Sequence, residues 1–393
     1  MVMTGLDLLA CGDEKLPVGG RVGLVTHAPA VDRTFRSSVE VVAALPGVKL
    51  ATLFGPEHGF HGQAQDLEGV ADGGSAGGPR VVSLYGDSAA SLRPTPDQLA
   101  GIDALVIDLV DIGSRYYTFQ ATMLYCLEAA VPLGIPVVVL DRPNPLGGAV
   151  IEGPALRPGC ESFIGCHDIA IRHGLSMGEL ARLYAAERRL DARGITVVSC
   201  RGWNRSQWFD QTGLPWVMPS PNMPTLDTAI VYPGQCLLEG TNLSEGRGTT
   251  RPFEICGAPW IDAAHLARDL EAAHLPGVAF RPVTFRPTFQ KHAWVDCGGI
   301  QMHVTDRDRF QPLRTGLAVL IALRRQDPER FAWRTEPYEF VADPIAIDLL
   351  CGSDRERRMI EAGADWRDIA AEWGPEEAAF ADRRATVVGH LTA

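Results

Sequence analysis

The sequence predicts an α/β fold, in which a Rossmann-like, doubly wound parallel sheet is followed by a second, smaller α+β C-terminal domain. Short apolar runs rich in β-branched residues recur through the first half of the chain, and helical patterns lie between them. Alternation of this kind is typical of parallel sheets whose two faces are covered by helices. The character of the sequence changes after residue 200, which indicates a different architecture for the second half.

The predicted strands are short runs bounded by Gly, Pro and Asp. Because they lack strict alternation of apolar and polar residues, they are typical of strands buried on both faces. They span residues 21–26, 48–54, 81–85, 104–109, 136–140 and 195–200. The helices predicted between them span residues 37–45, 118–131 and 177–186, the last opened by a capping box at Ser176 and Glu179.

The second half begins with a stretch of little periodicity between residues 203 and 259, rich in Gly, Pro, Asn and Trp. The elements predicted after it are helices at 262–274 and 313–326, strands at 278–285 and 299–304, and a largely helical tail over 353–390. The predicted domains are therefore residues 1–234 for the Rossmann-like part and residues 235–393 for the α+β part.

Composition excludes several classes of protein. Of the 393 residues, 46% are hydrophobic and 21% are charged, as in soluble globular proteins and unlike disordered or fibrous chains. The net charge is −12, which argues against nucleic acid or an anionic membrane surface as a main partner, because both need clustered Lys and Arg. No apolar stretch approaches the ~20 residues needed to span a bilayer.

The first residues lack the basic and apolar regions of a secretory signal peptide. We therefore expect a cytoplasmic location for the chain as it stands, and a periplasmic or secreted one if a leader was trimmed.

Polar, glycine-rich loops follow three of the predicted strands. They are residues 55–62 (GPEHGFHG), 111–118 (DIGSRYYT) and 141–148 (DRPNPLGG). In open parallel sheets, ligands bind beyond the carboxyl ends of the strands. Three such loops at one edge of one sheet indicate a site for a polar small molecule or a sugar.

Glu57 is the strongest single candidate for a catalytic group. It lies between a proline and a histidine on a turn flanked by glycines, so its carboxylate is expected to be held in one place. A glycosidase needs a carboxylic acid that protonates the leaving oxygen. The alternative is that Glu57 caps the following helix or pairs with a nearby arginine.

No metal or cofactor is predicted. His58 and His61, together with Glu57 and Asp66, could form a metal site, but Gly59 makes a helix there unfavourable and no HExxH spacing occurs. The alternative is that these histidines make hydrogen bonds in the loop, where His58 could set the charge state of a neighbouring carboxylate. His58 is also expected to contact the substrate. Neither GxGxxG after the first strand nor GxxxxGK[ST] is present, so nucleotide binding has little support.

Further candidate residues lie in two other polar segments. In the loop after residue 109, Asp111, Arg115 and Tyr117 offer a carboxylate, a carboxylate-binding fork and a ring with a hydroxyl. These three residues could equally stabilise the local structure of the loop. The segments 219–224 and 239–249 are rich in hydrogen-bonding groups and poor in apolar ones, which favours contacts to sugar hydroxyls, amides or carboxylates over an ordered connection. The candidates there are Asn222, Asn242, Glu245 and Arg247.

At these residues the sequence resembles a known family. The segments that carry the resemblance are GPEHGFHG, LYGDS, DLVDIGSRYYT, LDRPNPLGG, IEGPAL, IRHGLSMGELA, SPNMPTLDTAIVYPG and EGTNLSEGRGTTRPFE. They are similar to the exo-β-N-acetylmuramidase family, in family order and over nearly the whole chain. The resemblance implies a glycoside hydrolase that releases the terminal, non-reducing, β-linked N-acetylmuramic acid (MurNAc) from peptidoglycan fragments. MurNAc-GlcNAc, where GlcNAc is N-acetylglucosamine, is one such substrate in bacterial cell-wall turnover.

The resemblance also implies an active site in the cleft between the Rossmann-like catalytic domain and the smaller domain, with the family's essential glutamate at Glu57. The second catalytic group stays open between Glu245, Asp111 and the substrate's own acetamido group. An arginine, Arg115 or Arg247, is expected to bind the lactyl carboxylate of MurNAc.

Two positions depart from the family. Where the family often has Asp-Ile-Gln-Asp, this chain has Asp108-Leu109-Val110-Asp111, and where it often has Thr-Asn, this chain has Thr26-His27. Two other functions stay open: a muropeptide-binding or sensing protein without activity, and a metal-dependent hydrolase that uses Glu57, His58 and His61. The sequence does not predict the oligomeric state.

Overall fold

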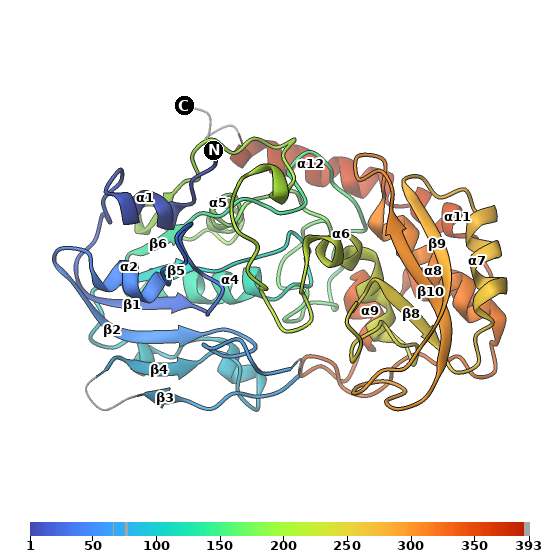
Figure 1. Cartoon of the computed structure of the whole chain (residues 1–393). Coiled ribbons are helices and arrows are strands. Elements are labelled where there is room, and N and C mark those ends of the chain that lie inside the picture. Colours follow the sequence, from blue (N-terminus) through green and yellow to red (C-terminus); the bar gives the residue numbers. More distant parts are fainter. Residues whose placement is uncertain (66, 75–77, 389–393) are drawn as a thin grey trace.

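The protein contains a large, mainly parallel sheet and a smaller antiparallel one, seen in a computed structural model that describes residues 1–65, 67–74 and 78–388 (Figure 1). The large sheet contains β1 (Gly20–Thr26), β2 (Val48–Gly55), β3 (Gly73–Gly74), β4 (Arg80–Ser83), β5 (Ala104–Asp108), β6 (Val137–Leu140) and β7 (Ile195–Val198). Their order is β3-β4-β2-β1-β5-β6-β7, and every neighbouring pair except β3–β4 is parallel.

Without the short β3, the strand order has the Rossmann pattern, with a reversal between β1 and β5. Side chains alternate between the two faces of each strand, and both faces are buried. In β6, for example, Val138 belongs to the core on one face, and Val137 and Val139 belong to the core on the other. This double burial explains why the strands are continuous apolar runs.

Helices cover both faces of the large sheet. Helices α1 (Gly5–Cys11) and α2 (Ser38–Ala43) contribute Leu6, Leu9 and Val41 to one core, and α4 (Phe119–Ala130) and α5 (Met177–Glu187) pack into the other. Each of α1, α2 and α5 begins with a reciprocal capping box. A short helix, α3 (Pro96–Leu99), precedes β5.

The smaller sheet has the antiparallel order β8-β10-β9 and lies at the opposite end of the molecule (Figure 1). Its strands are β8 (Ile255–Ala258), β9 (Val278–Phe285) and β10 (Cys297–Val304). The helices of this half are α6 (Leu226–Gln235), α7 (Ala263–Ala272), α8 (Pro312–Gln326), α9 (Ala346–Cys351), α10 (Arg355–Glu361), α11 (Trp366–Ala371) and α12 (Gly374–Val388). The last of them, α12, returns to pack against α5 of the first half.

The predicted fold class is confirmed, and most predicted elements match within one to three residues at each end. The helix α6 was missed, because it lies in the stretch of little periodicity after residue 203. The predicted helical tail is present up to Val388, and its last two residues, 389 and 390, lie outside the described part of the chain. The domain boundary at residue 235 stays a prediction. No helix of the described residues is long and apolar enough to cross a membrane.

Candidate active site

A pocket that contains Glu57 lies where the carboxyl ends of β2 and β5 face the segments around residues 220–253 and 338–339. We call it the Glu57 pocket. It is lined by Glu57, His58, Tyr116, Tyr117, Thr118, Phe119, Ile164, Ser220, Asn222, Met223, Tyr232, Glu239, Arg247, Phe253, Tyr338 and Glu339. Both halves of the sequence therefore contribute to it.

Glu57 is held in place by the tight turn that ends β2. A Cβ atom at Gly55 would lie 2.7 Å from the backbone nitrogen of Phe60, so this close approach requires glycine. His58 adopts a φ of 67°, in the left-handed region that non-glycine residues rarely occupy. Glu57 is only 6% exposed, and its Oε2 accepts a hydrogen bond of 2.5 Å from Oγ1 of Thr118. The turn and this hydrogen bond hold the carboxyl group in one place, and the catalytic role of Glu57 stays a prediction.

Aromatic rings form one wall of the Glu57 pocket. Tyr117 packs edge-on against Phe119 and Tyr232, with ring centroids 5.0 and 5.7 Å apart, and Tyr232 packs in the same way on Phe253 at 4.8 Å. Burial raises the pKa of the Tyr117 phenol well above its ordinary value, so the hydroxyl is a neutral hydrogen-bond donor and acceptor. Aromatic faces with polar edges suit the apolar face and hydroxyl rim of a sugar ring.

His58 lines the pocket next to Glu57. Its Nδ1 lies 2.8 Å from the carbonyl oxygen of Ala64, and because a carbonyl only accepts, Nδ1 carries the hydrogen. Within the described part of the chain, no three His, Cys, Asp or Glu side chains lie close enough together to hold a metal ion. Asp66, considered with His61 as a metal ligand, lies outside the described residues.

Arg247 supplies a positive charge to the Glu57 pocket. Its Nη1 donates to Oε1 of Glu239 over 2.7 Å and lies 3.5 Å from Oε1 of Glu245, and its guanidinium stacks 5.0 Å from the centroid of the Phe253 ring. Arg247 is 8% exposed. The aromatic contact and the two carboxylates fix the guanidinium at the pocket wall.

Glu245 lies behind Arg247 and does not line the pocket. Burial disfavours its charged form, but the Lys291 ammonium, whose Nζ is 2.9 Å from Oε2, and the Arg247 guanidinium outweigh burial and lower the pKa of Glu245. Glu245 therefore orients Arg247. Its predicted role as a catalytic group that touches the substrate is not supported by this position.

Arg115 does not reach the pocket either. It is 0% exposed, and its guanidinium donates four hydrogen bonds of 2.8–3.0 Å to backbone carbonyl oxygens. Those carbonyls belong to Pro154, Ile169, Leu350 and Cys351. This arrangement gives Arg115 a structural role, in place of the predicted contact to a substrate carboxylate.

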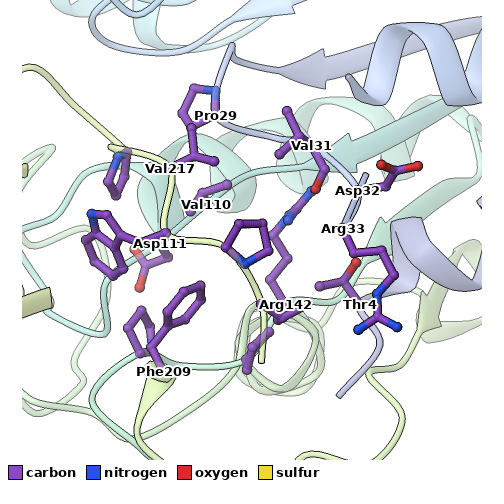
Figure 2. A pocket seen from close by; sticks show the side chains of 16 residues that line it. Thr4, Pro29, Val31, Asp32, Arg33, Val110, Asp111, Arg142, Phe209 and Val217 are labelled. Carbon is purple, nitrogen blue, oxygen red and sulfur yellow. The ribbon is translucent and has the colours of Figure 1, made fainter. Parts of the chain in front are cut away.

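The remaining candidates also differ in whether they line the Glu57 pocket. Asn222 lines the Glu57 pocket and donates to Oε1 of Gln65 over 2.9 Å. Asn242 does not line it, because its amide bonds to the backbone of Arg330 and Ala332. Asp111 lines a neighbouring cavity (Figure 2). Neither Glu245 nor Asp111 lines the Glu57 pocket, whose other carboxylates among the described residues are Glu239 and Glu339, so the second catalytic group stays open.

Several residues of the pocket were not singled out from the sequence. Thr118 and Glu239 lie inside segments that were recognised as polar, so a local signal existed for them. Tyr338 and Glu339 lie far along the chain with no glycine-rich or strand-end signal. Tyr338 donates to Oε2 of Glu239, and Glu339 accepts from the Tyr85 hydroxyl over 2.9 Å.

Comparison with known proteins identifies the family. Residues 22–227 match the N-terminal part, and residues 230–388 the C-terminal part, of the family described as exo-beta-N-acetylmuramidase NamZ. The chain belongs to the NamZ family. Over 370 residues it is 45% identical to the peptidoglycan beta-N-acetylmuramidase NamZ of Bacillus subtilis (strain 168), a match that covers 94% of this chain and 86% of that protein.

Two solved structures share the fold of this chain. The crystal structure of a DUF1343 family protein from Bacteroides fragilis NCTC 9343 is 33% identical to this chain, with a TM-score of 0.89 and 98% of both chains covered. A second DUF1343 family protein from the same organism is 24% identical, with a TM-score of 0.75 and the same coverage, and shares the fold. The family models and the Bacillus subtilis relative confirm the predicted family, and the fold shared with the two solved structures extends over nearly the whole chain.

Proposed function

We propose that this NamZ-family protein is an exo-acting glycosidase that removes terminal, non-reducing β-linked MurNAc from peptidoglycan fragments. The observation that carries the proposal is the position of Glu57, a buried carboxyl group that is held by Thr118 in a pocket with one fixed guanidinium. The 45% identity to the Bacillus subtilis peptidoglycan beta-N-acetylmuramidase supports the same activity here.

Glu57 is the proton donor in this proposal. A glycosidic oxygen that leaves as an alkoxide is a poor leaving group, and a positioned carboxylic acid that protonates it contributes about 10²–10⁴-fold in rate. The tight turn at Gly55 and the hydrogen bond from Thr118 restrict the carboxyl group to one orientation, which suits a single proton transfer.

Arg247 is the group that recognises MurNAc. This sugar differs from GlcNAc by a lactyl ether whose carboxylate is negatively charged, and a guanidinium is the side chain best suited to bind a carboxylate. Arg247 lines the pocket with Glu57, whereas Arg115 does not reach the pocket. An acidic protein can thus bind an acidic sugar through one local charge.

The test is hydrolysis of the disaccharide MurNAc-GlcNAc, whose leaving group is an alkoxide, beside the disaccharide GlcNAc-GlcNAc. We expect turnover of the MurNAc disaccharide and a loss of about 10²-fold or more in Glu57→Gln. This substitution keeps the size of the side chain and an acceptor for Thr118, and the exposed Glu271→Gln serves as the matched control.

Each other outcome contradicts the proposal in a recognisable way. MurNAc binding without turnover in the native chain would indicate a sensing protein. Activity that EDTA abolishes would indicate a metal-dependent hydrolase. Full activity in a normally folded Glu57→Gln variant would remove Glu57 as the acid.

A further inference from the structure

The Glu57 pocket is closed in this structure. All sixteen described residues that line it are buried, and none of them is more than 8% exposed. Its cavity volume is about 40 Å³, which holds only a few water molecules. Pockets that bind small molecules have volumes of about 300–1,000 Å³. A sugar can therefore reach Glu57 only if part of the pocket wall moves.

One segment that contributes to this wall, residues 335–344, is joined to the rest of the molecule mainly through side chains. We call it the strap. Its flanks, residues 335–337 and 342–343, are exposed. Among the described residues, no backbone–backbone hydrogen bond links the strap to the rest of the chain, and the two that it contains join Tyr338 and Val341 to each other. A segment held in this way can open locally while the rest of the fold stays intact.

The tip of the strap is a turn that ordinarily favours asparagine and glycine. Glu339 and Phe340 have φ values of 46° and 68°. The flanking residues, Tyr338 and Val341, exchange backbone hydrogen bonds of 2.8 and 3.0 Å, as in a two-residue hairpin turn. Larger side chains are strained at positive φ, and such strain is typical of segments with a functional role. The contacts of these side chains therefore indicate what the strap does.

These contacts connect the two halves of the molecule across the Glu57 pocket. Tyr338 donates a hydrogen bond to Oε2 of Glu239 in the second half. Glu339 accepts a hydrogen bond of 2.9 Å from the Tyr85 hydroxyl, in the loop after β4 of the first half. Phe340 packs on the same tyrosine with ring centroids 5.5 Å apart. Figure 1 shows the strap extending from the region of α9 toward the loops beside β4.

We propose that the strap is a gate, and that MurNAc enters the Glu57 pocket when the hydrogen bond between Tyr85 and Glu339 breaks and the strap moves away. This inference rests on the proposed function, in which the pocket holds MurNAc. Because the closed pocket has no room for a sugar, MurNAc binds only the open form. The measured affinity is then the affinity of the open form reduced by the fraction of molecules that are open. A weaker contact at Tyr85 raises that fraction and tightens binding.

The first experiment removes this contact with Tyr85→Phe, which keeps the ring that packs on Phe340 and loses the hydroxyl. Tyr85 is not among the residues that line the pocket, so the pocket wall keeps its side chains. Loss of a hydrogen bond to a carboxylate shifts such an equilibrium about tenfold or more. We therefore expect the Kd of MurNAc, measured by calorimetry, to fall about tenfold.

Tyr125→Phe is the matched control. Tyr125 packs on the ring of Phe163 at a centroid distance of 6.1 Å, as Tyr85 does at 5.8 Å, but it belongs to α4 and does not line the pocket. This variant should leave the Kd of MurNAc unchanged. An unchanged or larger Kd in Tyr85→Phe would overturn the inference, and so would an equal fall in Tyr125→Phe.

The second experiment locks the strap. In a double variant, Tyr85→Cys with Phe340→Cys, a short reagent that forms a disulfide with each thiol should tie the strap to the first half. We expect the affinity for MurNAc to fall about twentyfold or more after cross-linking and to return after reduction. The two single variants, treated with the same reagent, control for its reaction with the exposed Cys11. Binding that survives the cross-link would overturn the inference.

Both experiments measure binding, so they separate the gate from the proposed function. If the chain cleaves no MurNAc-GlcNAc but binds MurNAc more tightly in Tyr85→Phe, the proposed function fails and the gate stands. If the chain cleaves the disaccharide while Tyr85→Phe leaves the Kd of MurNAc unchanged, the gate alone fails. Absence of MurNAc binding in Tyr85→Phe would reject the gate as well.

Discussion

Thr118 donates a hydrogen bond of 2.5 Å from its Oγ1 to Oε2 of Glu57. This contact joins the turn after β2 to the residue that precedes α4. The strands that lead into these two segments, β2 and β5, lie on either side of β1 in the sheet. The orientation of the Glu57 carboxyl group therefore depends on the packing of α4 against the sheet.

Replacing Thr118 should weaken catalysis more than binding. In Thr118→Val the shape is kept but the hydrogen bond that holds the Glu57 carboxyl group in one orientation is lost, so we expect kcat on MurNAc-GlcNAc to fall about tenfold. KM should change less than about twofold, and Thr118→Ser should restore most of kcat. A rise in KM at constant kcat would instead indicate a direct contact of Thr118 to the sugar.

Replacing Arg247 with lysine should reduce the selectivity for MurNAc. Lysine keeps the charge near Glu239 but cannot offer a two-pronged guanidinium to a carboxylate. We expect KM for the MurNAc glycoside to rise about tenfold in Arg247→Lys. Arg251→Lys, at an arginine that pairs with Glu254 outside the pocket, should leave KM as it is. Equal values of KM in both variants would remove Arg247 from lactyl recognition.

Arg115 should be required for stability. In Arg115→Met four buried carbonyl oxygens lose their donors, and we expect the free energy of unfolding to fall by at least about 3 kcal/mol. The urea midpoint measures this, with the exposed Arg268→Met as the control. A variant as stable as the native chain, with a raised KM for MurNAc, would return Arg115 to the binding site.

These two arginines show what could be predicted from the sequence. Both lie in polar loops that contain glycine, and local sequence does not distinguish them. They differ in what surrounds them in three dimensions, because the carbonyls around Arg115 come from residues 154, 169, 350 and 351. Glu57 could be predicted because its turn is specified by its immediate neighbours.

The same contrast holds for the fold. Strands such as β2 and β9 could be placed within a residue because apolar runs and turn residues are local signals. Helix α6 could not, since it contains Pro233 and Gly234, which both disfavour a helix. It forms against α8, where a Cβ at Gly234 would lie 1.9 Å from the carbonyl oxygen of Pro312. Tertiary packing therefore overrides local preference there.

His27, one of the two departures from the family, should make stability depend on pH. Burial, with help from Arg142 and His58, lowers the pKa of His27 well below 6.5, and its Nε2 accepts a hydrogen bond from the Val110 nitrogen, so the folded state holds it neutral. Below about pH 6.5 the unfolded chain takes up a proton that the folded chain does not, and stability falls.

In His27→Asn this loss should disappear, because an amide oxygen can accept from Val110 and does not titrate. We expect the stability of the native chain relative to His27→Asn to fall by about 1–2 kcal/mol between about pH 7 and pH 5, measured by urea unfolding. His274→Asn, at an exposed histidine with a φ of 51° that asparagine tolerates, should show no such change. If the free energy of unfolding changed with pH in the same way in the native chain and in His27→Asn, His27 would not be the source of the pH dependence.

Glu187 fixes the last helix, α12, to the first half of the molecule. Its contribution to the stability of the fold should be lost at low pH. Its carboxylate accepts from Arg383 of α12 over 2.9 and 2.7 Å and from His167 over 2.5 Å. Partial burial disfavours the charged form, but the hydrogen bonds from Arg383 and His167 outweigh it and lower the pKa of Glu187 to about 2. A pKa below that of the unfolded chain stabilises the fold above about pH 4.5, and this stabilisation is lost as pH falls toward 2.

Glu187→Gln should therefore lower the free energy of unfolding at pH 7 by about 1–3 kcal/mol, a range that allows for solvent screening because the side chain is 26% exposed. More than half of the difference from the native chain should be gone at about pH 3, and Glu271→Gln should show no difference at either pH. Hydrogen exchange should locate the loosening in α12, since Arg383 then keeps only Asp168 as an ionic partner among the described residues. A difference that is the same at both pH values would mean that Glu187 stabilises the fold through packing rather than through its charge.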